Sequence, residues 1–198
     1  MKAILWLTGG VLFMTMASCG PGKKEREAKE KADSIRARAF RTQPRAREQY
    51  AANVKEAEAK MRASQSGEFN PEIANALIKA YLDYANTFTG DTLAPDYFYR
   101  AGEIAARGGN YDQAIFLFNT VADKYSEYKY VVEAMYEEAM IYDSKLPGND
   151  AKAKVIYEQI IRNYPKHKLA EDAKIAIANL GKSDEELVKE FEKKNHMK

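Results

Sequence analysis

Apolar residues recur along this chain at intervals close to one turn of an α-helix. The first stripe has spacings of i, i+4, i+7 and i+11, which place its members on one helix face; it consists of Tyr50, Val54, Ala57 and Met61. The second stripe has similar spacing and consists of Ile73, Leu77, Tyr81, Tyr84 and Phe88. No segment alternates with the period of two that is typical of strands. The pattern therefore predicts an all-α fold.

Turn-forming residues divide the rest of the chain into further helices. Asn70 and Pro71 have the residue types favoured at an N-cap and at the first helical position. Gly108-Gly109, Pro147-Gly148-Asn149 and Gly181 are expected to end helices. The predicted helices span residues 71–88, 95–107, 112–125, 128–145, 151–164 and 169–180. Ser183 and Glu186 predict a capping box at the start of a last, charged helix.

The predicted helices form an internal repeat. At an offset of 39 residues, small and aromatic positions recur in pairs: Ala114 with Ala153, Phe118 with Tyr157, Ala134 with Ala173, and Ala139 with Ala178. An earlier copy at an offset of 37 pairs Phe88 with Tyr125 and Gly102 with Ala139. Helical hairpins of this length cannot bury their apolar faces alone, so successive hairpins are expected to stack.

The repeat unit resembles the tetratricopeptide repeat. Gly102 and Ala139 stand at the small position of the first helix, and Phe118 and Tyr157 stand at the large aromatic position of the second helix. Three further positions fit the family's pattern, namely Ala114, Ala153 and the helix-ending Pro165. The sequence departs from the family at Ser126, which replaces that proline, and at Phe98 and Met135, which replace its tryptophan. The resemblance implies an α-solenoid of tetratricopeptide-like hairpins.

The N-terminal residues suggest an export signal. Residues 3–16 form an apolar run that suits a signal-peptide core and is too short to span a bilayer. Met16-Ala17-Ser18-Cys19 resembles the lipobox of bacterial lipoproteins. This implies that residues 1–18 are removed and that Cys19, the only cysteine, carries diacylglycerol and an amide-linked acyl chain such as palmitate. The alternative is an ordinary secretory signal that leaves Cys19 as a free thiol.

Residues 19–44 are expected to connect that cysteine to the repeats as a charged tether. They are rich in Lys, Arg, Glu and Ala, and Pro44 is expected to end any helix there, because the residue before a proline disfavours helical geometry. The predicted organisation is a signal peptide at 1–18, the lipidated cysteine and tether at 19–44, a helical-repeat domain at 45–182 and a charged helix at 183–198.

This organisation is similar to that of repeat lipoproteins of Bacteroidetes-type bacteria. It also resembles the helical lipoprotein of the outer-membrane β-barrel assembly machine and the periplasmic repeat protein that works with the Tol-Pal system. The resemblance implies a lipid-anchored protein of the outer membrane. Gly20, in place of an aspartate, favours that membrane, and the basic Lys23-Lys24 start of the tether favours its periplasmic face.

The composition argues against catalysis and against nucleic-acid binding. The 31 basic residues nearly balance the 29 acidic ones, so no strong positive field is expected. The only histidines are His167, in a predicted turn, and His196, near the end of the sequence. The adjacent pairs Glu137-Glu138 and Glu185-Glu186 point about 100° apart on a helix and are interpreted as solvated faces. We expect no enzyme activity, no metal and no cofactor.

The aromatic residues suggest both a core and a binding surface. Six of them are interpreted as packing residues between helices: Phe98, Phe118, Tyr125, Tyr142, Tyr157 and Tyr164. In tetratricopeptide-like units the first helix of each hairpin lines a concave groove. Counting from Gly102 and Ala139 places two sets of residues there, Tyr99, Glu103 and Arg107, then Tyr136, Met140 and Asp143. They form the candidate partner groove, and the alternative is that they are ordinary surface residues.

These features favour an interaction scaffold. The predicted protein is anchored by lipid and binds an envelope protein or peptide, with outer-membrane protein assembly as one role and division-linked envelope maintenance as another. A ligand binder or a cell-wall enzyme would need converging polar groups, which the sequence does not display. A purely mechanical spacer is the third alternative. The oligomeric state does not follow from the sequence.

Overall fold

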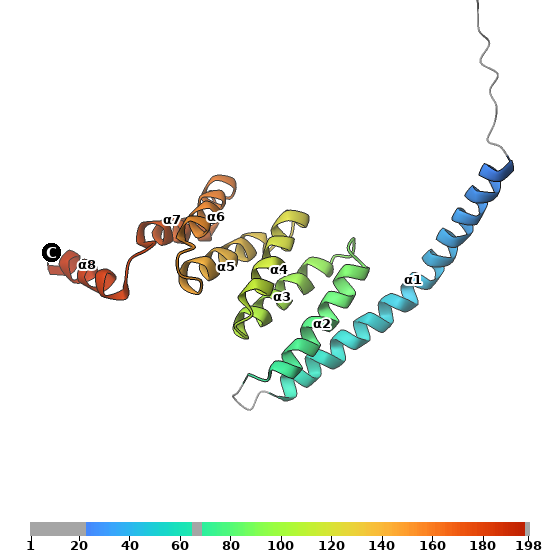
Figure 1. The fold of residues 1–198 in the computed structure, drawn as a ribbon, viewed down its shortest axis with the longest axis horizontal. Helices are drawn as coiled ribbons and strands as arrows, with labels where there is room; N and C mark the ends of the chain where they lie inside the picture. The colour runs from blue at the N-terminus through green and yellow to red at the C-terminus, as the bar shows by residue number, and fades with distance from the viewer. Residues whose placement is uncertain (1–22, 65–68, 197–198) are drawn as a thin grey trace, which may run out of the picture. The chain divides into compact units, whose positions relative to one another are not determined.

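The computed structural model describes residues 23–64 and 69–196, and there the protein consists of α-helices joined by turns (Figure 1). The helices are α1 (Lys23–Ala63), α2 (Pro71–Thr87), α3 (Ala94–Arg107), α4 (Tyr111–Lys124), α5 (Val131–Ser144), α6 (Asp150–Asn163), α7 (Lys168–Asn179) and α8 (Asp184–His196). These ranges contain no strand, and the expected all-α fold is confirmed. Cys19 and the predicted signal peptide lie outside the described residues. None of the described helices combines the length and apolar character needed to cross a membrane.

The chain divides into two compact units, residues 1–44 and 45–198. The first unit is described from Lys23, and its backbone is helical. The expectation that Pro44 ends this helix is wrong, because α1 continues through Pro44 to Ala63. A proline inside a helix removes one backbone donor and costs about 3 kcal/mol. Alanine, arginine, glutamate and lysine are strong helix formers, and they surround Pro44 on both sides along α1.

The same turn joins successive hairpins. In each copy a carbonyl at the end of one helix accepts a backbone hydrogen bond from the residue three positions later, at 2.8–2.9 Å: Phe88 from Asp91, Tyr125 from Tyr128, and Tyr164 from His167. A second bond of 3.0 Å then leads into the next helix. Because this turn occupies residues 128–130, α5 begins at Val131 rather than at Tyr128. The turns recur at the offsets found in the sequence.

Local sequence fixes the helix ends. The side chain of Asn70 accepts hydrogen bonds from the backbone amides of Glu72 and Ile73, at 3.0 and 3.2 Å, as expected of an N-cap. Gly181 follows α7 with a φ of 75°, a left-handed conformation that glycine adopts at little cost. The predicted capping box is confirmed, since Ser183 and Glu186 exchange hydrogen bonds of 2.9 and 3.3 Å.

Two hydrophobic cores hold the helices together. The first is formed mainly by α1–α4 and the second by α5–α7. Phe118 is 0 % exposed in the first core, and Tyr157 holds the corresponding place in the second. Gly102 permits the close approach of α3 to α4, because a Cβ there would lie 2.7 Å from Cε1 of Phe118. This confirms the small-residue position that the repeat predicts.

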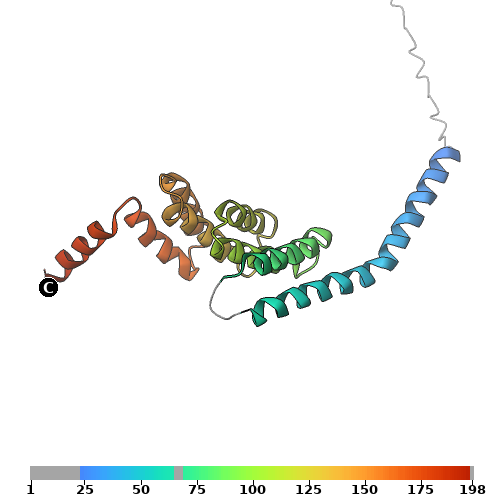
Figure 2. The same ribbon diagram turned by 60° about the horizontal axis from the view of Figure 1, so that its bottom comes forward.

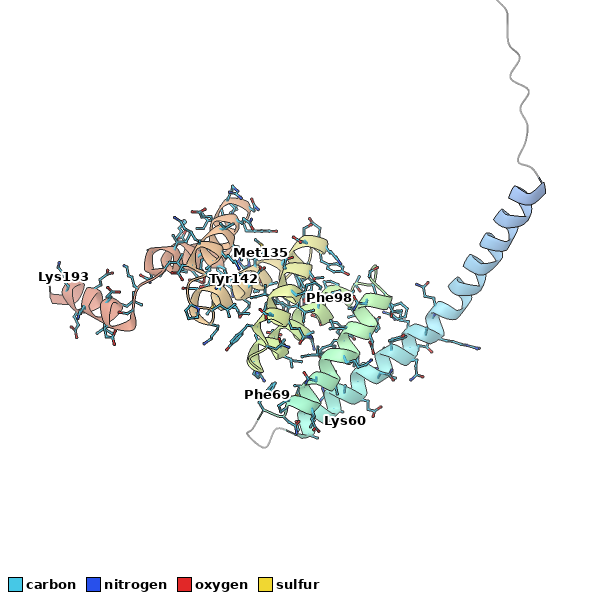
Figure 3. All side chains as sticks on the ribbon, in the orientation of Figure 1. Lys60, Phe69, Phe98, Met135, Tyr142 and Lys193 are labelled. Atoms are coloured by element: carbon cyan, nitrogen blue, oxygen red, sulfur yellow. The ribbon has the colours of Figure 1, made fainter. Side chains whose placement is uncertain are left out.

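The aromatic residues interpreted as packing residues do pack between helices. Phe98 and Tyr142 are labelled in Figure 3, and Met135, also labelled there, occupies the place of Phe98 in the following repeat. The six members of the set are buried or half-buried in the two cores: Phe98, Phe118 and Tyr125 in the first, and Tyr142, Tyr157 and Tyr164 in the second. That part of the interpretation is confirmed.

Candidate functional site

A cavity of about 940 Å³ lies beside α3, and we call it the α3 groove. Its walls come from the end of α1, from α2 with the residues just before it, from α3, and from the start of α5. Phe69, labelled in Figure 3, lies where the chain enters α2. The lining is aromatic and charged and consists of Met61, Ser64, Phe69, Asn70, Tyr81, Asp96, Tyr99, Arg100, Glu103, Ile104, Arg107, Tyr130 and Glu133. A volume of this size accommodates several side chains of a bound segment.

The structure brings together only one of the two predicted residue sets. Tyr99, Glu103 and Arg107 stand one turn apart on α3, and all three line the α3 groove. The second set lies on α5 outside the groove lining and consists of Tyr136, Met140 and Asp143. Tyr130 and Glu133 contribute to the groove from the start of α5 instead. Glu133 follows Asp96, another lining residue, by 37 residues, which is one repeat offset. This equivalence is the signal by which the sequence could have indicated Glu133 as a lining residue.

A hydrogen-bond network cross-links the groove walls. The hydroxyl of Tyr81 on α2 donates to Oε1 of Glu58 on α1 at 2.8 Å. Arg100 on α3 forms ion pairs with Asp96 at 2.7 Å and with Glu58 at 3.6 Å. The hydroxyl of Tyr128 donates to Oδ1 of Asp96 at 2.9 Å. Because these bonds tie three helices and the turn after α4 together, the groove is formed before any partner arrives.

Tyr99 combines packing with a polar surface. Its ring lies 5.8 Å from that of Phe118, 6.4 Å from that of Tyr128 and 5.8 Å from that of Tyr130, measured between centroids. Burial, and next the charge of Glu103, raise the pKa of the Tyr99 hydroxyl. The hydroxyl therefore stays protonated at neutral pH and is able to donate a hydrogen bond to a carbonyl of a bound segment.

The carboxylates near the groove differ from ordinary surface carboxylates. Burial, and next the charge of Glu137, raise the pKa of Glu103, and burial also raises the pKa of Glu137. Oε2 of Glu133 is buried without a hydrogen-bond partner among the described residues, and its Oε1 lies 3.7 Å from Nε2 of His167. A lysine or arginine from a partner would stabilise the ionised form of Glu103, whose pKa the charges of Arg100 and Arg107 only partly lower.

The second predicted set lies toward α6. The ring centroid of Tyr136 is 5.5 Å from that of Tyr157, so Tyr136 is partly a packing residue. Met140 is 40 % exposed. Burial, and next the charge of Asp150, raise the pKa of Asp143, while a hydrogen bond from Tyr157 lowers it. These three residues form a separate surface whose role in binding stays a prediction.

Other polar residues near the helices have structural roles. Nδ1 of His167 accepts a hydrogen bond of 3.3 Å from the backbone amide of Leu169 at the start of α7, so this histidine caps a helix. Glu138 is among the buried residues of α5, so its interpretation as part of a solvated face is wrong. Within residues 23–64 and 69–196 no group of three or more acidic, histidine or cysteine side chains could hold a metal.

Comparison with known proteins identifies the repeat. Residues 96–128 and 133–167 each match the tetratricopeptide repeat family. The first segment covers most of α3 and all of α4, and the second covers most of α5 and all of α6. No curated protein matches the sequence. The two matched segments coincide with the hairpins α3–α4 and α5–α6, and the expected all-α solenoid of tetratricopeptide-like hairpins is confirmed.

Proposed function

Because the chain carries tetratricopeptide repeats, which typically form non-catalytic protein-interaction scaffolds, we propose that it is a lipid-anchored scaffold that binds a protein partner in the bacterial cell envelope. The α3 groove is the observation that carries the proposal. Its walls are cross-linked, so little ordering cost accompanies binding there. Its lining joins tyrosine hydroxyls, aromatic rings and charged side chains, which are the groups that dominate binding energy at protein interfaces.

The groove best suits an extended or helical segment of a partner protein that carries a basic side chain. Tyr99 offers a hydroxyl donor, and Glu103 and Glu133 add carboxylates to the lining, of which that of Glu103 has a raised pKa. Arg107 is exposed at the end of α3 and is able to pair with an acidic group at the other end of the same segment. Peptide recognition by helical grooves uses such side-chain anchors.

The proposed anchor is Cys19, and the proposed location is the periplasmic face of the outer membrane. Two or three acyl chains on this residue would bury enough methylene groups, at about 0.8 kcal/mol each, for stable attachment. The charged residues from Lys23 onward would then separate the repeats from the bilayer surface. Outer-membrane protein assembly is one role that such a scaffold could serve, and division-linked envelope maintenance is the other.

Exchanging two charges in the groove is expected to abolish partner binding. The variant Glu103→Lys/Arg107→Glu keeps the net charge but reverses the local pattern on α3. The intact chain and the variant are purified from gently solubilised envelopes, and co-purifying proteins are quantified by mass spectrometry. We expect at least tenfold less of the specific partner with the variant, because like charges then face each other across the interface.

The matched control for this experiment is Lys79→Glu/Asp83→Lys on α2. These two exposed residues form an i,i+4 ion pair of 2.6 Å, do not line the α3 groove, and keep their pairing when exchanged. The control is expected to retain the partner fully, and circular dichroism checks that both variants are folded. Equal recovery of the same proteins with the groove variant and the intact chain would refute the scaffold proposal at this site.

Removing the Cys19 thiol is expected to detach the protein from the membrane. Cys19→Ser provides no thioether link, so the variant should incorporate no labelled palmitate, whereas the intact chain should be labelled and should sediment with outer-membrane vesicles. Fractionation and metabolic labelling measure the two effects. Undiminished labelling of the serine variant would disprove the lipid-anchor proposal and would leave the groove experiment unaffected.

A further inference from the structure

The last described hairpin lacks a contact that the two complete repeats make. Tyr99, Tyr136 and Ile175 occupy equivalent positions on α3, α5 and α7, at offsets of 37 and 39 residues. In the first two repeats the tyrosine packs against an aromatic ring of the following helix, with centroids 5.8 Å apart for Tyr99 and Phe118 and 5.5 Å apart for Tyr136 and Tyr157. Ile175 has no such cover and is 60 % exposed.

The small-residue position of α7 is uncovered in the same way. Gly102 and Ala139 are buried where the second helix of their hairpin crosses them. Their counterpart Ala178 is exposed. Ile175 and Ala178 are three residues apart, so they share one side of α7, and we call this side the α7 face. An exposed apolar residue and a small residue on one side of a helix are typical of a face that packs against another helix.

The sequence of α8 fits that place. Phe118 and Tyr157 are the aromatic residues that pack against the first helix of their hairpins. Each is the eighth residue of its own helix, counted from Tyr111 in α4 and from Asp150 in α6. The eighth residue of α8, which begins at Asp184, is Phe191. The connection before α8, residues 180–183, is intermediate in length between residues 108–110 and 145–149, which connect the two complete hairpins. By register, α8 is the second helix of a third hairpin.

In the structure α8 nevertheless leads away from α7, as Figures 1 and 2 both show. Two local contacts hold its first turns in this arrangement. They are the capping box between Ser183 and Glu186 and an ion pair of 2.9 Å between Lys182 and Glu190. Val188 on α8 is 55 % exposed. The α7 face and Val188 of α8 are therefore both exposed in one copy of the chain.

We infer that α8 of one copy covers the α7 face of a second copy, and that the exchange is reciprocal. Such an exchange is self-complementary, so two copies close a symmetric dimer and leave no further open face of this kind. Charge supports the same pairing. Asp172 is exposed beside Ile175 and forms no ion pair with a side chain that the structure describes, while α8 carries exposed Lys189 and Lys193. Lys193 is labelled on α8 in Figure 3.

Disulfide trapping between two differently substituted chains tests this exchange. Both are full chains with Cys19→Ser, one with Ile175→Cys and the other with Phe191→Cys, so that no bond within a chain is available. We expect a cross-linked dimer to form on mild oxidation, with at least tenfold higher yield than from the control mixture of Val155→Cys and Phe191→Cys. Val155 is an exposed residue of α6 outside the α7 face.

Mass measurement gives a second readout. By light scattering the unsubstituted chain should have twice the monomer mass, and Ile175→Glu should restore the monomer mass, since Ile175 is exposed and its replacement spares the core. Equal cross-linking in the test and control mixtures, or none in either, would overturn the inference. A third variant carries both Ile175→Cys and Phe191→Cys in one chain with Cys19→Ser. A disulfide that forms within this chain, and not between the two singly substituted chains, would also overturn the inference, because α8 would then cover the α7 face of its own chain.

Discussion

Replacing Gly102 by valine is expected to lower the free energy of unfolding by about 3 kcal/mol. An ideal Cβ at this position would lie 2.7, 2.9 and 3.0 Å from three ring atoms of Phe118. The ring cannot move aside cheaply, because Phe118 is fully buried in the first core. Valine improves helix propensity over glycine by only a few tenths of a kcal/mol, so overpacking dominates. Urea unfolding followed by circular dichroism measures the change.

Two further variants make this prediction specific. Gly90→Ala introduces a Cβ that meets nothing within 4 Å and should change stability by less than about 0.5 kcal/mol. Phe118→Leu combined with Gly102→Val should be more stable than the sum of the single variants by at least about 1 kcal/mol, since the smaller side chain makes room for the new methyl groups. If the stability changes of the two single variants simply add up in the double variant, the contact between residue 102 and Phe118 is not the cause of the destabilisation.

The helices and their repeat could be predicted because their signals are local. Asn70, Gly181 and the Ser183–Glu186 pair act on the nearest backbone groups, so residue type and spacing suffice to locate helix ends. The small position at Gly102 followed from comparing the chain with itself at an offset of 37 residues. A repeat makes tertiary contacts visible in sequence, because each contact recurs with the same spacing.

Pro44 shows where local reasoning fails, and the second predicted residue set shows where it does not locate a cavity. The rule about the residue before proline weighs one residue, whereas α1 is decided by the many helix-forming residues around Pro44. Tyr136 was assigned to a partner surface because it is the repeat equivalent of Tyr99; it does not line the α3 groove, and its role in binding stays a prediction. Successive units of a solenoid are rotated relative to each other, so α5 reaches the α3 groove with Glu133 instead.

The environment of Glu138 was also beyond sequence reasoning. Glu137 and Glu138 are neighbours of the same residue type, and their exposure depends on how α5 is turned against α4. The structure leaves Glu137 half-buried and Glu138 only 7 % exposed. No periodic signal separates them, because a glutamate at a buried position breaks the apolar pattern rather than completing it.

Glu138→Gln is expected to stabilise the protein increasingly as the pH rises. Burial, and next the charge of Asp123 on α4, raise the pKa of Glu138 from 4.5 to about 7. Its carboxylate forms no hydrogen bond and no ion pair with a described residue. Ionising Glu138 in the folded state is therefore costly, and glutamine has the same size without the charge.

The sign of the effect follows from the two pKa values. Above pH 4.5 the unfolded chain loses this proton first, so the stability of the intact chain falls until the pH passes about 7 and is constant beyond it. At about 1.4 kcal/mol for each pH unit, Glu138→Gln should gain up to about 3 kcal/mol relative to the intact chain at pH 8 and almost nothing near pH 4. Urea unfolding at several pH values measures this difference. Glu127→Gln, at an exposed turn position, should follow the intact chain throughout. Other carboxylates with a raised pKa, such as Glu103, act equally in both chains. Parallel curves for Glu138→Gln and the intact chain would therefore show that Glu138 is not the costly ionisation.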